Sequence, residues 1–174
     1  YQRILEEALA EMNENTVGPE KEYISDCTIE TDLEVMIPDD YISQVPEKIR
    51  LYKELDNMRE EDQLQRFFAG LEDRFGPVPD PLKQLGYVVR LRRIAIKLGF
   101  ERIVLKNGIM LAYFINNPQS SYYKSTLFAE ILNYISSNPR HFFVKEHNNK
   151  LFVKVSQVNS VEAAYNLLKI FAKH

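Results

Sequence analysis

The spacing of apolar residues changes from a helical to a strand period after Gly99, and this change most constrains the fold. Before it, residues 80–98 place their apolar side chains on one side of a helix, and a glycine at its end is typical of a helix stop. After it, 102–105 and 109–115 flank the sequence Lys-Asn-Gly at 106–108. Asn-Gly favours a tight turn with positive φ, so these residues predict a β-hairpin directly after the helix.

The same plan recurs further along the chain. Apolar residues at helical spacing predict a helix around 127–135, and a second hairpin is predicted from 142–146 and 151–155, joined by 147–149. A last helix is predicted over about 160–172. Two hairpins, each followed by a helix, predict an α+β fold with a four-stranded, largely antiparallel sheet that helices cover on one side.

Two further helices are predicted before residue 80. Pro46 suits the first turn of a helix that continues to Asp56, and Asn57 with Glu60 has the spacing of a capping box for the next helix. That second helix is predicted to end at Gly76. Its apolar residues cluster on one side; they are Leu64, Phe67, Phe68, Leu71 and Phe75.

The N-terminal part divides into three predicted segments. Residues 1–14 have the pattern of an amphipathic helix, 13–32 form a polar linker broken by Gly18-Pro19, and a short strand is predicted at 33–37. The chain begins at Tyr1 inside an amphipathic pattern, so we expect it to be a fragment of a larger protein. We expect 1–32 to be an appendage and 33–174 to form one domain.

Length and composition exclude several classes of protein. The chain has 174 residues, of which 45% are hydrophobic, so it can bury a core. Its longest apolar runs, such as 109–115, are far shorter than the ~18 residues that a membrane span needs, and no signal segment opens the chain. We therefore expect a cytoplasmic protein. Its single cysteine, Cys27, cannot form an internal disulfide.

Charge divides unevenly between the two halves of the chain. Residues 1–80 contain 8 Lys and Arg against 21 Asp and Glu, whereas 81–174 contain 14 against 4, so the halves carry net charges of −13 and +10. Opposite charges of this size can hold the halves together, and any charge left exposed offers a surface to a partner of the opposite sign. Solvated faces that happen to segregate are the alternative.

No motif indicates catalysis, a cofactor or a metal. The six glycines form neither of the nucleotide-binding loop patterns, and His141, His147 and His174 do not cluster with other ligands. Cys27 lacks a nearby base and is expected to be incidental in the polar linker. Acid pairs such as Asp39-Asp40 are common in turns, and we expect no catalytic residue. An enzyme with a pocket built from distant residues stays open as the least favoured hypothesis.

Two helix faces are candidate interaction surfaces. On the helix of 80–98, Arg90, Arg93 and Lys97 form a basic stripe, which could meet DNA phosphates but is more typical of a solvated or protein-facing surface. On the preceding helix, Arg66, Gly70 and Asp73 lie opposite the apolar side, so Asp73 is predicted to point away from the core. Geometry alone favours an ordinary solvated carboxylate at that position.

Several short motifs follow one another in a distinctive order. They are Met36-Ile37-Pro38-Asp39-Asp40-Tyr41-Ile42, Arg50-Leu51-Tyr52-Lys53, Asp73-Arg74-Phe75-Gly76-Pro77-Val78-Pro79, Arg90-Leu91-Arg92 and Leu98-Gly99-Phe100. In this order and spacing they resemble the C-terminal domain of bacterial transcription-repair coupling factors. The match is strong across 33–103, while only the pattern of hairpins and helices fits beyond it. Residues 1–14 resemble the helix that leads out of the family's motor region.

The resemblance implies a regulatory domain of a large ATP-driven DNA translocase. That translocase releases RNA polymerase stalled at DNA damage and recruits UvrA for nucleotide excision repair. ATP and Mg²⁺ would belong to its motor, polymerase and DNA to other domains, and no cofactor to this chain. In the family, the C-terminal domain packs against an N-terminal UvrB-like module of the same protein and covers the surface that UvrA uses.

The resemblance also implies roles for particular residues. Asp73 would pair with the basic, UvrA-binding patch of the N-terminal module, with Glu72, Arg66 and Gly70 at the same intramolecular interface. Family members often carry an acidic residue where this chain has Gly70, and Glu72, Asp62 or Glu61 would stand in for it. Arg74 and Phe75 would hold the helix end and its turn. The alternative is a nucleic-acid-binding accessory domain that uses Arg90, Arg93 and Lys97.

Overall fold

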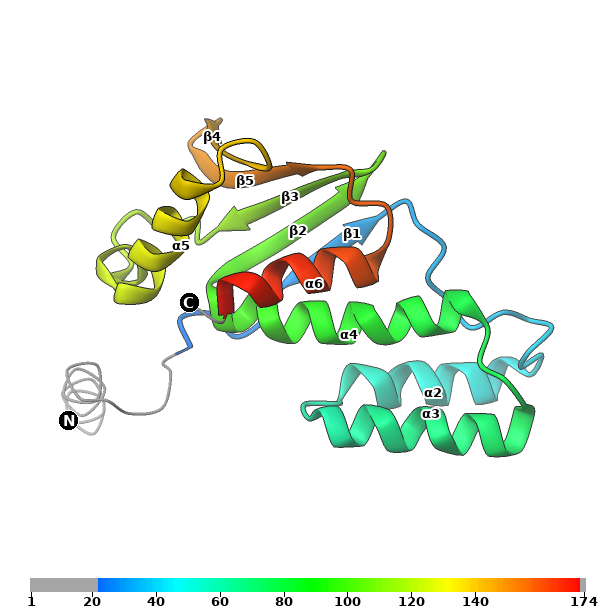
Figure 1. Ribbon diagram of the computed structural model, residues 1–174. Coiled ribbons are helices and arrows are strands. Elements are labelled where there is room, and N and C mark those ends of the chain that lie inside the picture. Colours follow the sequence, from blue (N-terminus) through cyan, green and yellow to red (C-terminus); the bar gives the residue numbers. More distant parts are fainter. Residues whose placement is uncertain (1–21, 173–174) are drawn as a thin grey trace, which may run out of the picture.

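Five strands form one mixed sheet in the order β1-β2-β3-β5-β4 (Figure 1). The computed structural model describes residues 22–172, so the helix predicted at 1–14 lies outside the described residues. The strands are β1 (Thr28–Thr31), β2 (Phe100–Lys106), β3 (Ile109–Phe114), β4 (Phe142–His147) and β5 (Lys150–Ser156). The α+β class and the two antiparallel hairpins are confirmed, and the fifth strand makes the sheet mixed rather than four-stranded.

The extra strand, β1, corrects the sequence prediction. A strand was expected at 33–37 and a linker at 13–32, but the strand lies at Thr28–Thr31 and pairs in parallel with β2. Segment 33–37 does not join the sheet. The backbone N–H of Met36 in this segment donates a hydrogen bond to the Pro81 carbonyl. The domain boundary between 32 and 33 stays a prediction.

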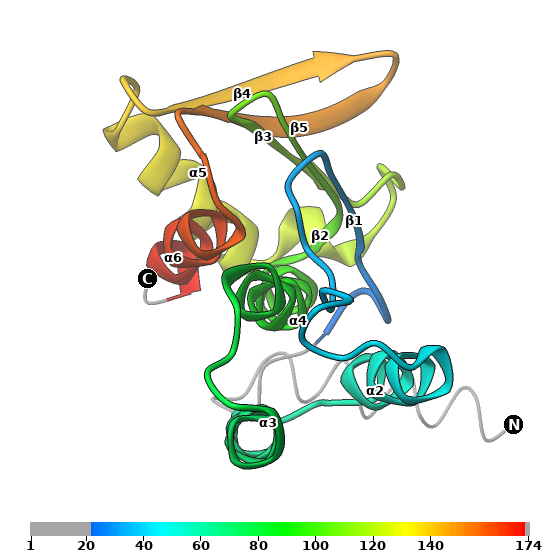
Figure 2. The ribbon, with the colours of Figure 1, turned by 90° about the vertical axis from the view of Figure 1, so that its right-hand side faces the viewer.

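Helices cover one face of the sheet and form a second layer beyond it (Figure 2). The helices against the sheet are α4 (Asp80–Leu98), α5 (Thr126–Ser137) and α6 (Val161–Ala172), with the short 3₁₀ helix η1 at Ser121–Lys124. The second layer is the pair α2 (Val45–Asp56) and α3 (Glu61–Phe75), which lies on the far side of α4. No described helix lies on the other face of the sheet (Figure 2).

Two hydrophobic clusters hold these layers together. The larger joins the sheet to α4, α5 and α6, and the smaller fills the space between α2, α3 and α4. Along β2 and β3 the buried residues alternate with half-exposed ones, as expected for a sheet with one covered face. The core-facing side chains of these strands include Ile103, Leu105, Met110 and Ala112.

The start of α3 differs from its predicted capping box by one helical turn. The box is formed by Glu60 and Gln63, not by Asn57 and Glu60. Asn57 instead ends α2, because its backbone N–H and its side-chain amide both donate to the Lys53 carbonyl. The two helices therefore meet at a short turn in which Asn57 caps a C-terminus rather than an N-terminus.

Candidate protein-interaction surface

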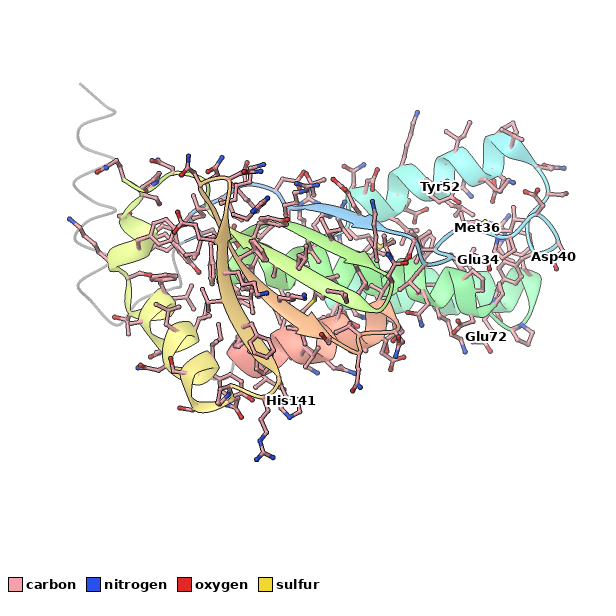
Figure 3. The ribbon with its side chains drawn as sticks, turned by 90° about the horizontal axis from the view of Figure 1, so that it is seen from above. Glu34, Met36, Asp40, Tyr52, Glu72 and His141 are labelled. Carbon is pink, nitrogen blue, oxygen red and sulfur yellow. The ribbon has the colours of Figure 1, made fainter. Side chains whose placement is uncertain are left out.

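Exposed carboxylates gather at one end of the molecule, where the loop of residues 33–44 passes the C-terminal end of α3. Figure 3 shows Glu34, Asp40 and Glu72 at this end, together with Met36, whose side chain is 41% exposed. Asp73 follows Glu72 on α3 and is exposed as well. None of these carboxylates forms an ion pair with another described residue. We call Glu34, Asp40, Glu72 and Asp73 the acidic end.

Two tyrosines fix the path of the loop. The Ile37 N–H donates to the Tyr52 hydroxyl of α2 at 2.8 Å, and Ile37 itself is only 2% exposed. The Tyr41 hydroxyl donates to the carbonyls of Gly76 at 2.9 Å and Leu71 at 3.2 Å, at the end of α3. These bonds attach the loop to both helices of the second layer, so Asp40, which lies between the anchors, faces solvent from a fixed backbone.

Arg74 and Phe75 hold the end of α3, in agreement with their expected role. A guanidinium nitrogen of Arg74 lies 3.2 Å from Glu47 of α2, and the guanidinium sits 4.7 Å from the centre of the Phe75 ring. Phe75 is half-buried and packs against the Tyr41 ring with centroids 5.8 Å apart. Arg74 therefore pairs with α2 and does not form an ion pair with the neighbouring Asp73.

The predicted outer face of α3 is open to solvent. Arg66, Gly70 and Asp73 are all exposed, as their helical spacing predicts. A Cβ added to Gly70 would meet no atom within 4 Å. Glu61, one of the residues expected to stand in for the missing acid at Gly70, is engaged elsewhere, whereas Glu72 and Asp62 are exposed.

We expect Gly70→Ala to raise the free energy of unfolding by about 1 kcal/mol, because glycine in a helix interior is less favourable than alanine by that amount. The open space around Gly70 leaves nothing for the new methyl group to strain. Urea denaturation would show a higher midpoint with an unchanged slope. A midpoint at or below that of the wild type would contradict this description of the α3 surface.

The basic stripe of α4 is partly neutralised within the domain. Nη2 of Arg90 lies 2.8 Å from Oε1 of Glu61 on α3, and Nη2 of Arg93 lies 2.9 Å from Oε2. Burial raises the pKa of Glu61, but the hydrogen bonds and charges of the two arginines outweigh burial and bring this pKa below its ordinary value. Of the three predicted residues, Lys97 alone is exposed. The sequence prediction did not include the docking of α3 on α4, which pairs two of the three cations with Glu61.

Cys27 lies in the core and not in a polar linker. Its side chain is 3% exposed, and burial raises the pKa of the thiol to about 12, so the thiol stays protonated at neutral pH. Activated cysteine nucleophiles have a lowered pKa instead. Among residues 22–172 no three His, Cys, Asp or Glu side chains are grouped so that they could hold a metal ion. Within the same range no helix is long and apolar enough to cross a membrane.

The sequence prediction named Asp73 and Glu72 and missed the loop part of this surface. Glu34, Met36 and Asp40 were assigned to a strand or a turn, although Pro38-Asp39-Asp40 marked the turn correctly. The exposed apolar residues Val45 (60%) and Ile49 (49%) at the start of α2 were also missed. The sequence shows that apolar and acidic residues lie close together in this segment. It does not show which of these side chains are exposed, because that depends on how the loop folds.

Comparison with known proteins identifies relatives of this fold. The family model described as TRCF domain matches residues 31–125, which is more than half of the chain. The transcription-repair-coupling factor of Rickettsia bellii is 27% identical over 155 residues, and that of Escherichia coli is 31% identical over 104. These regions cover 88% and 59% of this chain but 13% and 9% of the relatives, so the chain spans a small fraction of their length.

A solved structure shares the fold. The crystal structure of a C-terminal domain of transcription-repair coupling factor superposes with a TM-score of 0.67, covering 86% of this chain and 95% of that one. Sequence identity is 17%, so the likeness concerns the fold alone.

Proposed function

Because this chain belongs to the TRCF domain family, the family of C-terminal domains of transcription-repair coupling factors, we propose that it is a regulatory interaction domain and not an enzyme. In this proposal the acidic end docks on an N-terminal UvrB-like module of the same protein and masks the surface that UvrA binds. The parent protein would be an ATP-driven DNA translocase that releases RNA polymerase stalled at DNA damage and recruits UvrA for nucleotide excision repair.

The observation that carries the proposal is the set of free carboxylates on a fixed backbone. Several acids among the described residues are used internally: Glu47 by Arg74, Glu61 by Arg90 and Arg93, and Asp39 by Lys48. The four carboxylates of the acidic end form no ion pair with described residues, so their negative charges are available to a partner. A basic patch on a partner would complement it.

Exposed apolar side chains in the same layer of the fold support a protein partner rather than a small ion. Met36, Val45 and Ile49 are the exposed apolar residues of this layer, from the loop and the first turns of α2. An apolar contact rimmed by charged groups is the usual anatomy of a protein interface. Charge would select the partner and apolar burial would add affinity.

A tethered contact of this kind can be weak and still stay closed. Modules joined by one chain meet at effective concentrations in the millimolar range when the linker spans their sites. An interface with a dissociation constant of about 10 µM would then be closed about 99% of the time. UvrA would compete with the domain for the same surface, so the affinity of one lowers the apparent affinity of the other.

The test is the titration of this chain with the isolated N-terminal UvrB-like module. We expect Asp73→Arg to weaken binding about tenfold, because it replaces an attraction with a repulsion at the interface. Raising the salt from about 0.1 M to about 1 M should weaken the wild type as well, since the Debye length falls from about 10 Å to about 3 Å.

Glu130→Arg on α5 is the matched control. It makes the same change of net charge far from α2 and α3 (Figure 1) and should leave the affinity unchanged. Equal affinities for wild type and Asp73→Arg, with no effect of salt, would show that the charged docking mechanism is wrong.

The alternative of a nucleic-acid-binding stripe on α4 has less support. Two of its three cations, Arg90 and Arg93, pair with Glu61 and are only 16% and 21% exposed. Binding of phosphates there would have to displace an internal carboxylate, which lowers the gain from each contact.

A further inference from the structure

The face of the sheet that no described helix covers has its own chemical character. Successive residues of a strand point to opposite faces, and those facing α4 and α6, such as Ile103, Ala112 and Val153, are buried in the core. Their neighbours along each strand therefore point to the other side. We call that side the open face; in Figure 3 the strands lie in front of the helices, so this face is toward the viewer.

One row of the open face alternates charge and aromatic rings across four strands. Arg102 of β2 pairs in register with Tyr113 of β3, Tyr113 with Phe152 of β5, and Phe152 with Lys145 of β4. The rings of Tyr113 and Phe152 have centroids 5.1 Å apart, and the Arg102 guanidinium lies 5.3 Å from the centre of the Tyr113 ring. All four residues are exposed or half-exposed.

The neighbouring row repeats the combination. It consists of Val104, Leu111, Lys154 and Phe143, in register from β2 to β4. The Phe143 side chain is 47% exposed, and this ring is a diagonal neighbour of Phe152, which places such residues roughly 7 Å apart. Three rings, on three adjacent strands, thus share the open face with cations on both sides.

Positive charge dominates this face. Lys106 also points to it from β2, and the carboxylate among the paired residues of this face is Glu30 of β1, opposite Val104. Glu30 lies 3.0 Å from Arg102 and 3.8 Å from Lys106, so it offsets the charge at the β1 side only. Lys145 and Lys154 form no ion pair with a described residue. Their charges, beside Phe143 and Phe152, are available to an anion.

We propose that the open face binds single-stranded DNA. Unpaired bases would stack on Tyr113, Phe152 and Phe143, while Lys145 and Lys154 would contact the phosphates between them. Stacking on rings within a basic surface is how proteins hold single strands without reading their sequence. A duplex hides the faces of its bases, so a flat ring surface of this kind selects single strands.

Two other ligands fit this surface less well. A protein partner would bury Lys145 and Lys154. It would have to supply an acid at each position, because burying an unpaired charge costs free energy. RNA recognition uses polar groups that contact the 2′-hydroxyl, and in the two rows the Tyr113 hydroxyl is the one neutral polar group beside rings, aliphatic chains and cations. We therefore assign the face to DNA. It lies on the opposite side of the fold from α2 and α3, so its occupation and the docking of the acidic end are independent (Figure 2).

The test uses the 174-residue chain and a fluorescein-labelled deoxythymidine oligonucleotide of about 12 nucleotides, a length within the usual site size. Fluorescence anisotropy at low salt should give saturable binding in the micromolar range. We expect Phe143→Ala to weaken it about tenfold. Lys154→Ala should reduce the slope of log K against log salt by about 0.7, the value for one phosphate contact on a single strand.

Controls separate this site from other basic surfaces. Phe143 is half in solvent, so circular dichroism and the unfolding midpoint of Phe143→Ala should match the wild type. Lys97→Ala on α4 should bind as the wild type does, and a duplex of equal length should bind at least about tenfold more weakly.

Several results would overturn the proposal. They are the absence of saturable binding, an unchanged affinity of Phe143→Ala, a loss with Lys97→Ala as large as that with Lys154→Ala, and equal binding of the duplex. A uridine oligonucleotide that binds about tenfold more tightly than deoxythymidine would overturn the assignment to DNA. Each outcome is independent of binding to the UvrB-like module.

Discussion

Gly99→Ala is expected to lower the free energy of unfolding by about 3 kcal/mol, the largest stability effect that we predict for a single methyl group in this domain. Gly99 ends α4 with φ of +89°, a conformation that costs an L-residue about 1–2 kcal/mol. In addition, a Cβ at this position would lie 2.2 Å from Cε1 of Tyr122. Real Cβ atoms do not approach other atoms so closely, so either the ring or the backbone must move.

The Tyr122 ring has little room to move. It is fully buried, its hydroxyl donates to the Leu98 carbonyl at 2.6 Å, and it packs against Phe128 and Tyr123 with centroids 5.3 and 5.4 Å away. Displacing it would break that bond and open the aromatic cluster beneath the sheet. The methyl group therefore adds overpacking to backbone strain.

Urea denaturation of Gly99→Ala alongside Gly70→Ala tests this account, because the same chemical change is made at a crowded and at an open glycine. The two midpoints should shift in opposite directions, downward for Gly99→Ala and upward for Gly70→Ala. A free energy of unfolding of Gly99→Ala within about 0.5 kcal/mol of that of the wild type would mean that the Tyr122 cluster is not packed as described.

The sequence predicts the hairpins and α4 well because the signals for them are local. Asn107 and Gly108 both have positive φ, 55° and 73°, as the Asn-Gly turn requires, and Gly99 ends α4 in the expected left-handed conformation. Strand β1 was missed because it has only four residues, and its partner β2 lies about 70 residues further along the chain. A parallel pairing of that kind leaves no turn motif in the sequence.

The charge asymmetry of the sequence has a structural counterpart. Ion pairs join the acidic half to the basic half: Glu61 to Arg90 and Arg93, Asp56 to Arg92, and Glu30 to Arg102. This agrees with the expectation that opposite charges hold the halves together. Which charged residues form these ion pairs depends on how α3 docks on α4. The helical period predicts the face of a helix on which a residue lies but not the element that this face contacts.

The candidate surface was predictable in part for the same reason. The period of α3 places Asp73 outward, and the resemblance to the family draws attention to it and to Glu72. Glu34 and Asp40 join them only because Tyr41 and Tyr52 fix the loop against α3 and α2. Those hydrogen bonds connect residues 15 to 35 positions apart, which spacing along the sequence does not reveal.

Under the proposed function, Glu72→Arg combined with Asp73→Arg in the full-length parent protein is expected to increase the apparent affinity for UvrA by at least about tenfold. The apparent affinity is the intrinsic affinity multiplied by the fraction of molecules with a free docking surface, so an internal contact that is closed about 99% of the time can hide up to about 100-fold. Two charge reversals at the acidic end would weaken that contact, while the UvrA site itself is unchanged.

The control is Glu130→Arg combined with Glu146→Arg, which alters net charge equally on the elements α5 and β4. It should leave UvrA binding as it is in the wild type. The isolated N-terminal module sets the upper limit, because it has no C-terminal domain to mask it.

Measurement of UvrA binding to the wild-type parent, the Glu72→Arg/Asp73→Arg variant and the isolated module tests most directly whether the acidic end closes the protein on itself. We predict that the wild type binds most weakly and that the variant approaches the isolated module. Equal affinities for all three would contradict the proposal, because UvrA would then find its surface free while the acidic end is intact.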